Sequence, residues 1–139
     1  MDSSRSDPLN GVRPVFRAVV ETVVPEAVRL DGDGWTELEE IVRGALDSRP
    51  RHLVRQLRLL LRVIDLRARM TGHGFVALGA GDRARILSWF EASRALLLRR
   101  GFWGLRTLAL MGYYARPAAA REIGYRAHAG GWAARGEGR

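Results

Sequence analysis

The segment from residue 50 to residue 70 constrains the fold of this chain more than any other. Its apolar residues recur every three or four positions, which is the period of an α-helix. At the helical angle per residue, five arginines fall within about 60° of one another: Arg51, Arg55, Arg58, Arg62 and Arg69. The apolar residues occupy the far side and also a flank formed by Leu59, Val63, Leu66 and Met70. One neighbouring helix cannot bury so wide an arc, so we expect this helix at the centre of a bundle or half covered by a partner.

Similar spacing predicts four further helices, over residues 14–24, 35–46, 82–93 and 94–114. Thr36 and Glu39 have the spacing of a capping box at the start of the second helix. The last helix is apolar most of the way round, and its glycines indicate close backbone approach or local breaks: Gly101, Gly104 and Gly112. The fold class that we predict is all-α, a compact bundle of about five helices with an extended C-terminal tail.

The length of 139 residues allows one domain of ordinary size. We expect residues 1–12 to form a flexible N-terminal lead, residues 13–125 the helical domain, and residues 126–139 an extended or partner-bound tail. No export signal is recognisable in the first residues, and no stretch is apolar enough to span a membrane. The expected location is therefore the cytoplasm.

All 23 basic residues are arginine, and the net charge is +8. This excess fits an anionic partner such as nucleic acid, lipid headgroups or an acidic protein surface. Abundant alanine and glycine beside arginine also fit the codon choice of a GC-rich genome, so the charge alone does not identify a partner. Cysteine is absent, which excludes disulfides, thiolate metal sites and cysteine nucleophiles.

Residues that carry chemistry are scattered along this sequence. His52, His73 and His128 each stand alone, whereas a metal site needs three or four ligands. The carboxylates of Glu37, Glu39 and Glu40 gather at the expected start of a helix, where the helix dipole favours them. Asp31–Asp33 matches only the first positions of a calcium loop. We therefore expect no catalytic, cofactor-binding or metal-binding residue in this chain.

Aromatic residues gather late in the sequence, and arginine forms the stripe described above. Tryptophan, tyrosine and arginine dominate binding hot spots in protein interfaces. The candidate partner-binding residues are Trp103, Tyr113, Tyr114, Tyr125, Trp132, Arg55, Arg58 and Arg62.

The second half of the sequence resembles the gluconate 2-dehydrogenase subunit 3 family. The resemblance rests on the following features: Phe75-x-x-Leu78 after Gly74, a helix start at Asp82-Arg83, an aromatic helix over Phe102–Tyr114, then Tyr113-Tyr114-x-x-Pro117 and Gly124-Tyr125. The first half agrees loosely, with a helix that ends at Val24-Pro25 followed by a second and a long third helix. The resemblance thus extends over about residues 14–126, and the tyrosine-rich segment is its most specific part.

The resemblance implies a small, non-catalytic helical subunit that binds and stabilises a large flavin-dependent oxidoreductase of the glucose–methanol–choline type. The expected complex is a hetero-oligomer that acts on a sugar, an alcohol or a sterol, and its FAD belongs to the partner. Many members of the family carry a twin-arginine signal that this sequence lacks, which puts export of the partner in doubt. The alternative hypothesis is a basic helical module that binds nucleic acid through the arginine stripe.

Overall fold

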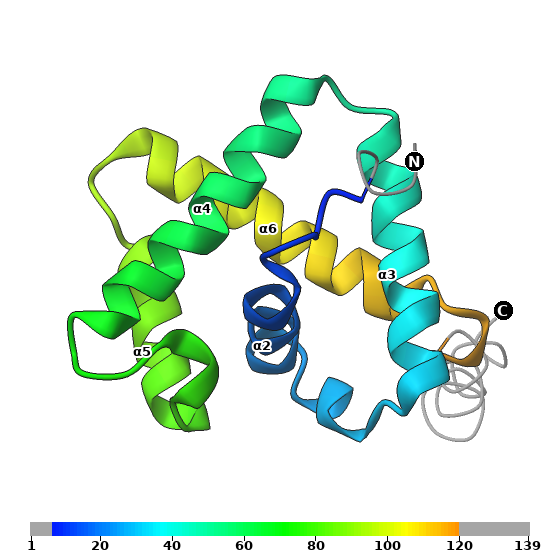
Figure 1. Cartoon of the computed structure of the whole chain (residues 1–139), viewed down its shortest axis with the longest axis horizontal. Helices are drawn as coiled ribbons and strands as arrows, with labels where there is room; N and C mark the ends of the chain where they lie inside the picture. The colour runs from blue at the N-terminus through cyan, green and yellow to red at the C-terminus, as the bar shows by residue number, and fades with distance from the viewer. Residues whose placement is uncertain (1–6, 120–139) are drawn as a thin grey trace, which may run out of the picture.

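The computed structural model describes residues 7–119, and these residues fold into helices and connecting turns without a β-strand (Figure 1). The elements in chain order are α2 (Arg13–Val23), the 3₁₀ helix η1 (Pro25–Arg29), α3 (Gly32–Asp47), α4 (Arg51–Arg69), the 3₁₀ helix η2 (Phe75–Ala77), α5 (Ala80–Glu91) and α6 (Leu96–Tyr114). This architecture confirms the predicted all-α bundle. The expected C-terminal tail over residues 126–139 lies outside the described residues.

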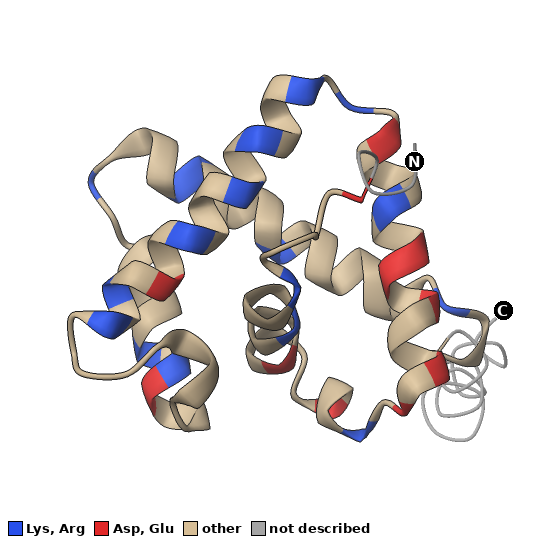
Figure 2. Cartoon of the chain, in the orientation of Figure 1, with Lys and Arg blue, Asp and Glu red and all other residues tan. Residues whose placement is uncertain are grey.

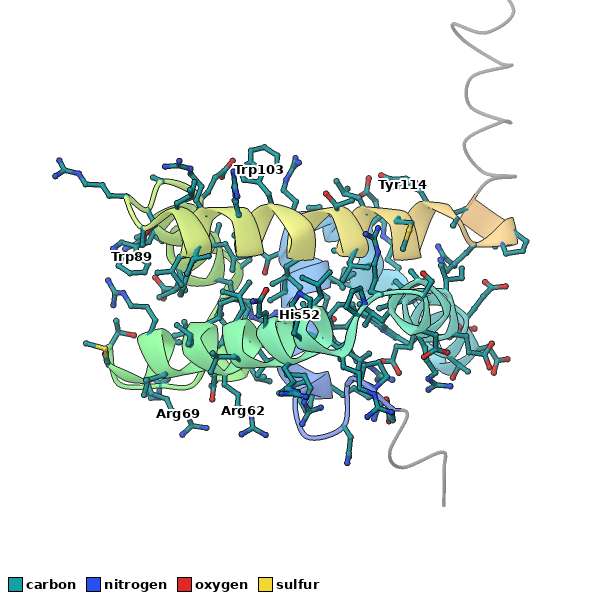
Figure 3. All side chains as sticks on the ribbon, turned by 90° about the horizontal axis from the view of Figure 1, so that it is seen from above. His52, Arg62, Arg69, Trp89, Trp103 and Tyr114 are labelled. Carbon is teal, nitrogen blue, oxygen red and sulfur yellow. The ribbon has the colours of Figure 1, made fainter. Side chains whose placement is uncertain are left out.

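Helix α2 is the centre of the fold. It contacts α4, α5, α6 and η2, and it runs across the molecule from the side of α6 to the side of α4 (Figure 3). Phe16, Val19 and Val20 are fully buried on it. Neighbours surround this short helix, so its apolar residues are covered on several sides at once.

The two long helices, α4 and α6, lie at opposite edges of the molecule in Figure 3. The inner side of α6 contacts α2, α3, α4 and α5, and it buries Phe102, Leu105 and Ala109. The inner side of α4 buries Leu61 and Ile64. The chain itself covers α4 on one side only, so the segment 50–70 is not central, and coverage of its other side by a partner stays a prediction.

The glycines of α6 do not break the helix, which contradicts one of their two interpretations, and their surroundings differ. A Cβ on Gly112 would lie 2.8 Å from Cγ2 of Val42 on α3, so the missing side chain permits the close approach of two helices. A Cβ on Gly101 would lie 3.3 Å from Leu60 on α4. Gly104 has no atom within 4 Å of that position and faces open space.

The expectation of a flexible lead over residues 1–12 is wrong for residues 7–12, while residues 1–6 lie outside the described part of the chain. Leu9 and Val12 are buried in the core. A guanidinium nitrogen of Arg58 donates hydrogen bonds to the backbone carbonyls of Pro8, at 3.0 Å, and Asn10, at 2.6 Å. An arginine of α4 thus holds this segment in place, which a local sequence pattern does not show.

The expected capping box is also wrong. Helix α3 begins earlier, at Gly32, and the side chain of Asp31 accepts a hydrogen bond from the backbone N–H of Gly34 at 2.7 Å. Thr36 and Glu39 therefore lie inside the helix. Asp31 serves as the cap because a carboxylate satisfies one of the free N–H groups of the first turn.

Candidate partner-binding surfaces

The outer side of α6 presents a row of six residues spaced by three or four positions. We define the α6 outer strip as Leu96, Arg100, Trp103, Thr107, Leu110 and Tyr114, which fall within about 80° on a helical projection. Leu96 and Trp103 are each 47% exposed, and Leu97 beside them is 81% exposed. Carboxylates are absent from the sequence between residues 92 and 119. The strip is therefore apolar, aromatic and basic.

The side chain of Trp103 points away from the body of the molecule (Figure 3). The guanidinium of Arg106 lies 5.3 Å from the centre of its ring, within the range of a cation–π interaction. This contact favours one orientation of an otherwise exposed ring. A partner that covers Trp103 therefore loses less side-chain entropy than it would with a freely rotating ring.

The outer side of α4 presents a second row of different chemistry. We define the α4 outer strip as Arg55, Leu59, Arg62, Leu66, Arg69 and Met70, within about 100° on a helical projection. Leu59, Leu66 and Met70 are 62%, 60% and 74% exposed. The apolar flank expected from the sequence is thus largely uncovered, with Val63 half-buried. Aliphatic side chains and guanidinium groups alternate along this strip.

The structure separates the predicted partner-binding residues into two surfaces. Trp103 and half-buried Tyr114 belong to the α6 outer strip, while Arg55 and Arg62 belong to the α4 outer strip, on the opposite side of the molecule (Figure 3). No single flat partner surface can therefore contact all four of these residues.

Two of the candidate residues have roles within the fold, and two lie outside the described residues. Tyr113 is buried, with the guanidinium of Arg116 4.4 Å from its ring centre, so it belongs to the core. Arg58 is half-buried and holds the N-terminal segment through the hydrogen bonds described above. Tyr125 and Trp132 are the two outside residues 7–119.

Exposed apolar residues that the sequence reasoning did not select complete these surfaces. On the α6 side they are Leu96 and Leu97, and on α5 Trp89 is 46% exposed with the guanidinium of Arg67 5.0 Å from its ring centre. The wide apolar arcs of the long helices predicted that part of their surface would be uncovered. The arcs did not identify which residues would be exposed.

Charge is divided unevenly between the two halves of the described chain (Figure 2). Residues 7–47 contain nine carboxylates and four arginines, whereas residues 48–119 contain three carboxylates and fourteen arginines. The half that contains α4 and α6 is therefore strongly basic, and the half that contains α3 is acidic. A charge separation of this kind orients a molecule toward an anionic partner before contact.

The glutamates that the sequence places near the start of α3 differ in burial and in their partners. The Glu39 carboxylate is buried and accepts hydrogen bonds from Nε of Arg13, at 2.9 Å, and Nε of Arg17, at 2.5 Å. Glu40 is exposed, and Glu37 lies 3.9 Å from a guanidinium nitrogen of Arg116. Glu39 thus joins α3 to α2 through two ion pairs.

His52 and His73 are exposed and lie on separate elements, and His128 lies outside the described residues. Within residues 7–119, no three His, Asp or Glu side chains gather closely enough to hold a metal ion. A pocket of about 390 Å³ opens beside the start of α3, and no residue of either outer strip lines it; its lining includes Asp31, Asp33 and Arg116. The cap formed by Asp31 accounts for one of these acidic groups.

Searches with models of known families, with curated proteins and with solved structures found no match for this chain. Across residues 7–119, no helix has the length and apolar character needed to cross a membrane.

Proposed function

We propose that this chain is a non-catalytic helical subunit that binds a larger protein through the α6 outer strip. The observation that carries the proposal is the exposure of Leu96, Leu97 and Trp103 on one helix. Apolar residues on a monomer surface are common when they are scattered, but several of them close together on one helix are typical of an interaction surface. The outer strip extends along α6 through half-buried Leu110 and Tyr114.

The chemical character of the strip favours a protein as the partner. Tryptophan, tyrosine and arginine are the residues most often found at binding hot spots, and the strip contains Trp103, Tyr114 and Arg100. Thr107 adds a hydroxyl, but it donates to the backbone carbonyl of Trp103 at 2.8 Å. The strip therefore offers mainly apolar area with basic groups at its margin, as an interface core with a polar rim does.

The partner that we propose is the large subunit of an FAD-dependent oxidoreductase of the glucose–methanol–choline type, acting on a sugar, an alcohol or a sterol. This identity rests on the resemblance of residues 14–126 to the gluconate 2-dehydrogenase subunit 3 family. In such a complex the FAD and the reaction belong to the large subunit, and this chain contributes binding and stabilisation.

Co-expression of the full chain with a flavoprotein of this type encoded beside it tests the proposal. We expect both proteins to purify together and the flavoprotein to lose solubility when expressed alone. The double substitution Leu96→Ser with Trp103→Ala should weaken the complex at least tenfold, because it removes a hot-spot ring and its neighbouring apolar contact. Analytical ultracentrifugation of the co-purified complex over a dilution series measures the loss.

The matched control is the double substitution Val28→Ser with Val76→Ser, because these valines are also exposed but lie on η1 and η2. It should leave the complex unchanged. A complex that tolerates the α6 substitutions would refute the α6 outer strip as the interface. A stable monomer that does not bind the flavoprotein would refute the identity of the partner.

Nucleic-acid binding by the arginine stripe has less support than this proposal. Arg58 holds the N-terminal segment, and Nε of Arg69 lies 2.9 Å from a carboxylate oxygen of Asp65. The exposed side chains of Leu59 and Leu66 lie among the remaining arginines. A phosphate backbone offers these leucines no apolar contact.

A further inference from the structure

We propose that the α4 outer strip is a peripheral binding surface for membranes that contain anionic phospholipids. The proposal concerns the side of the molecule opposite the α6 outer strip and does not depend on the flavoprotein partner. It rests on three observations: exposed apolar side chains on α4, exposed arginines beside them, and the position of α4 at the edge of the fold.

The exposed residues of α4 form two parallel rows. The apolar row is Leu59, Leu66 and Met70, each at least 60% exposed. The basic row is Arg55, Arg62 and Arg69, displaced from the apolar row by about 60° around the helix. Helices that lie in the plane of a membrane interface have this division, with aliphatic side chains between the acyl chains and arginines at the phosphates.

The basic row is available for an anionic ligand. Arg55 and Arg62 are exposed and make no ion pair or hydrogen bond with the other residues of the range 7–119. Arg69 pairs with Asp65, but its side chain is still 66% exposed. Figure 3 shows Arg62 and Arg69 extending away from the body of the molecule.

The carboxylate of Asp65 offsets the charge of Arg69 but does not pair with Arg55 or Arg62. One of its oxygens accepts the hydrogen bond from Arg69, and the other accepts the backbone N–H of Phe75 at 2.9 Å. Apart from Asp65, α4 contains no acidic residue. The excess of arginine in residues 48–119 strengthens attraction to an anionic surface over a distance of about one Debye length, roughly 8 Å at physiological ionic strength.

The geometry favours a bilayer over the other anionic partners. Nucleic acid would satisfy the arginines but leave Leu59 and Leu66 against phosphates and sugars. An acidic amphipathic helix usually binds in a groove, whereas the pocket described above is lined by residues outside α4. A bilayer interface accepts a single projecting helix, and α4 is about 28 Å long, so its whole outer strip fits into one plane.

Co-sedimentation of the full chain with vesicles tests the proposal. The probes are phosphatidylcholine vesicles with and without phosphatidylglycerol, each at low and at physiological salt. We expect binding to the anionic vesicles only, and we expect it to weaken as salt increases. The double substitution Arg55→Gln with Arg62→Gln should weaken binding about 20- to 30-fold, that is about fivefold for each arginine.

A second variant tests the apolar row without changing the charge. The double substitution Leu59→Ser with Leu66→Ser should weaken binding at least tenfold. In the original chain both leucine side chains move from water into the membrane interface, and the serine variant loses this hydrophobic contribution. Circular dichroism and urea unfolding verify that each variant keeps the fold. Both leucines are mostly exposed in the free protein, so substitution should change its stability little.

Two control variants test whether the loss of binding is specific to the α4 outer strip. Arg29→Gln with Arg85→Gln removes the same charge from exposed positions on η1 and α5, and Val28→Ser with Val76→Ser removes exposed apolar groups elsewhere. Both should bind vesicles within about twofold of the original chain. Equal losses in the charge control would show an effect of net charge and overturn the assignment to α4.

Three other outcomes would also overturn the proposal. They are absence of binding to anionic vesicles, equal binding to phosphatidylcholine alone, and loss of binding in the Leu96→Ser with Trp103→Ala variant instead of the α4 variants. Retention of the chain on duplex DNA or single-stranded RNA, without vesicle binding, would assign the basic row to nucleic acid instead.

Discussion

The inner and outer sides of the two long helices both carry large apolar side chains, but only those of the inner side are covered by the rest of the chain. On the inner side of α6, Phe102 and Leu105 pack against α2 and its neighbours, while on the outer side Leu96 and Trp103 are half exposed. On α4 the same contrast separates Leu61 from Leu59. The comparison shows that α4 and α6 carry more apolar surface than the rest of the chain covers. The uncovered part is aromatic on α6 and alternates with arginine on α4.

Truncation of a core aromatic side chain, Phe16 of α2, and of the outer Trp103 should show the largest difference between covered and uncovered side chains. We expect Phe16→Ala to lower the free energy of unfolding by about 3–5 kcal/mol, because the ring is fully buried at the centre of the fold. Trp103→Ala should change it by less than about 1 kcal/mol. Urea unfolding monitored by circular dichroism measures both. Phe16→Leu, expected to cost less than about 1.5 kcal/mol, provides a folded variant if Phe16→Ala does not fold.

The glycines of α6 provide the second comparison. A methyl group at Gly112 would lie 2.8 Å from the buried side chain of Val42, so Gly112→Ala should destabilise the protein by about 1–2 kcal/mol after the gain in helix propensity. Gly104→Ala meets no atom and should stabilise it by up to about 1 kcal/mol. Equal effects at both positions, measured by thermal unfolding, would contradict the close packing of α3 against α6.

An inner and an outer carboxylate on α3 give the third comparison. Glu39→Gln leaves Arg13 and Arg17 without their charged partner, and these arginines are 31% and 39% exposed. Water therefore screens part of the loss, and we expect a cost of about 1–2 kcal/mol in urea unfolding. Glu40→Gln removes an exposed carboxylate and should change stability by less than about 0.5 kcal/mol. Indistinguishable variants would show that Glu39 does not join α2 to α3.

The smallest effect should be seen in the dependence of stability on pH. Burial acts to raise the pKa of Asp65, but the hydrogen bonds from Arg69 and the Phe75 N–H outweigh it, so the pKa lies below 3.8. A carboxyl group with a lowered folded-state pKa stabilises the fold above its unfolded pKa, and this contribution disappears as pH falls below about 4. Asp65→Asn should cost about 1 kcal/mol at pH 7 and should reduce the loss of stability on acidification.

The Asp65→Asn variant should still lose some stability on acidification, because Asp7 contributes to it in the same way. Its pKa is also lowered, since the hydrogen bonds from Arg13 and the Leu9 N–H outweigh the opposing effect of burial. The control Asp47→Asn replaces an exposed carboxylate and should leave the change in stability between pH 5 and pH 2 unaltered. An Asp65→Asn variant with the same change as the original chain would contradict the role of this contact.

The periodicity of the sequence predicted the helical class and the approximate bounds of α2, α4 and α6. It succeeded because a repeat of three to four residues is a local property that depends on the neighbours within two turns. The start of α3 was predicted less well, since Asp31 and the Thr36–Glu39 pair both have capping chemistry and the choice between them depends on the preceding loop. The 3₁₀ helices η1 and η2 were not predicted.

The candidate surface was predicted only in part. Trp103, Arg55 and Arg62 are exposed, as residues that bind a partner must be, whereas Tyr113 and Arg58 serve the fold. The role of Arg58 depends on carbonyl groups about fifty positions earlier in the chain. A helical projection therefore placed it in the same stripe as Arg55 and Arg62 although its neighbours in space differ.

The sequence by itself determined that this chain forms helices, that α4 bears a row of arginines, and that two long helices carry wide apolar arcs. Only the tertiary structure decided which part of each arc is covered, because burial depends on contacts between segments far apart in the sequence. It also decided that the aromatic strip of α6 and the arginine and leucine strip of α4 lie on opposite sides. The physical reason is that α4 and α6 pack against each other and against α2, so that each long helix has a single inner side.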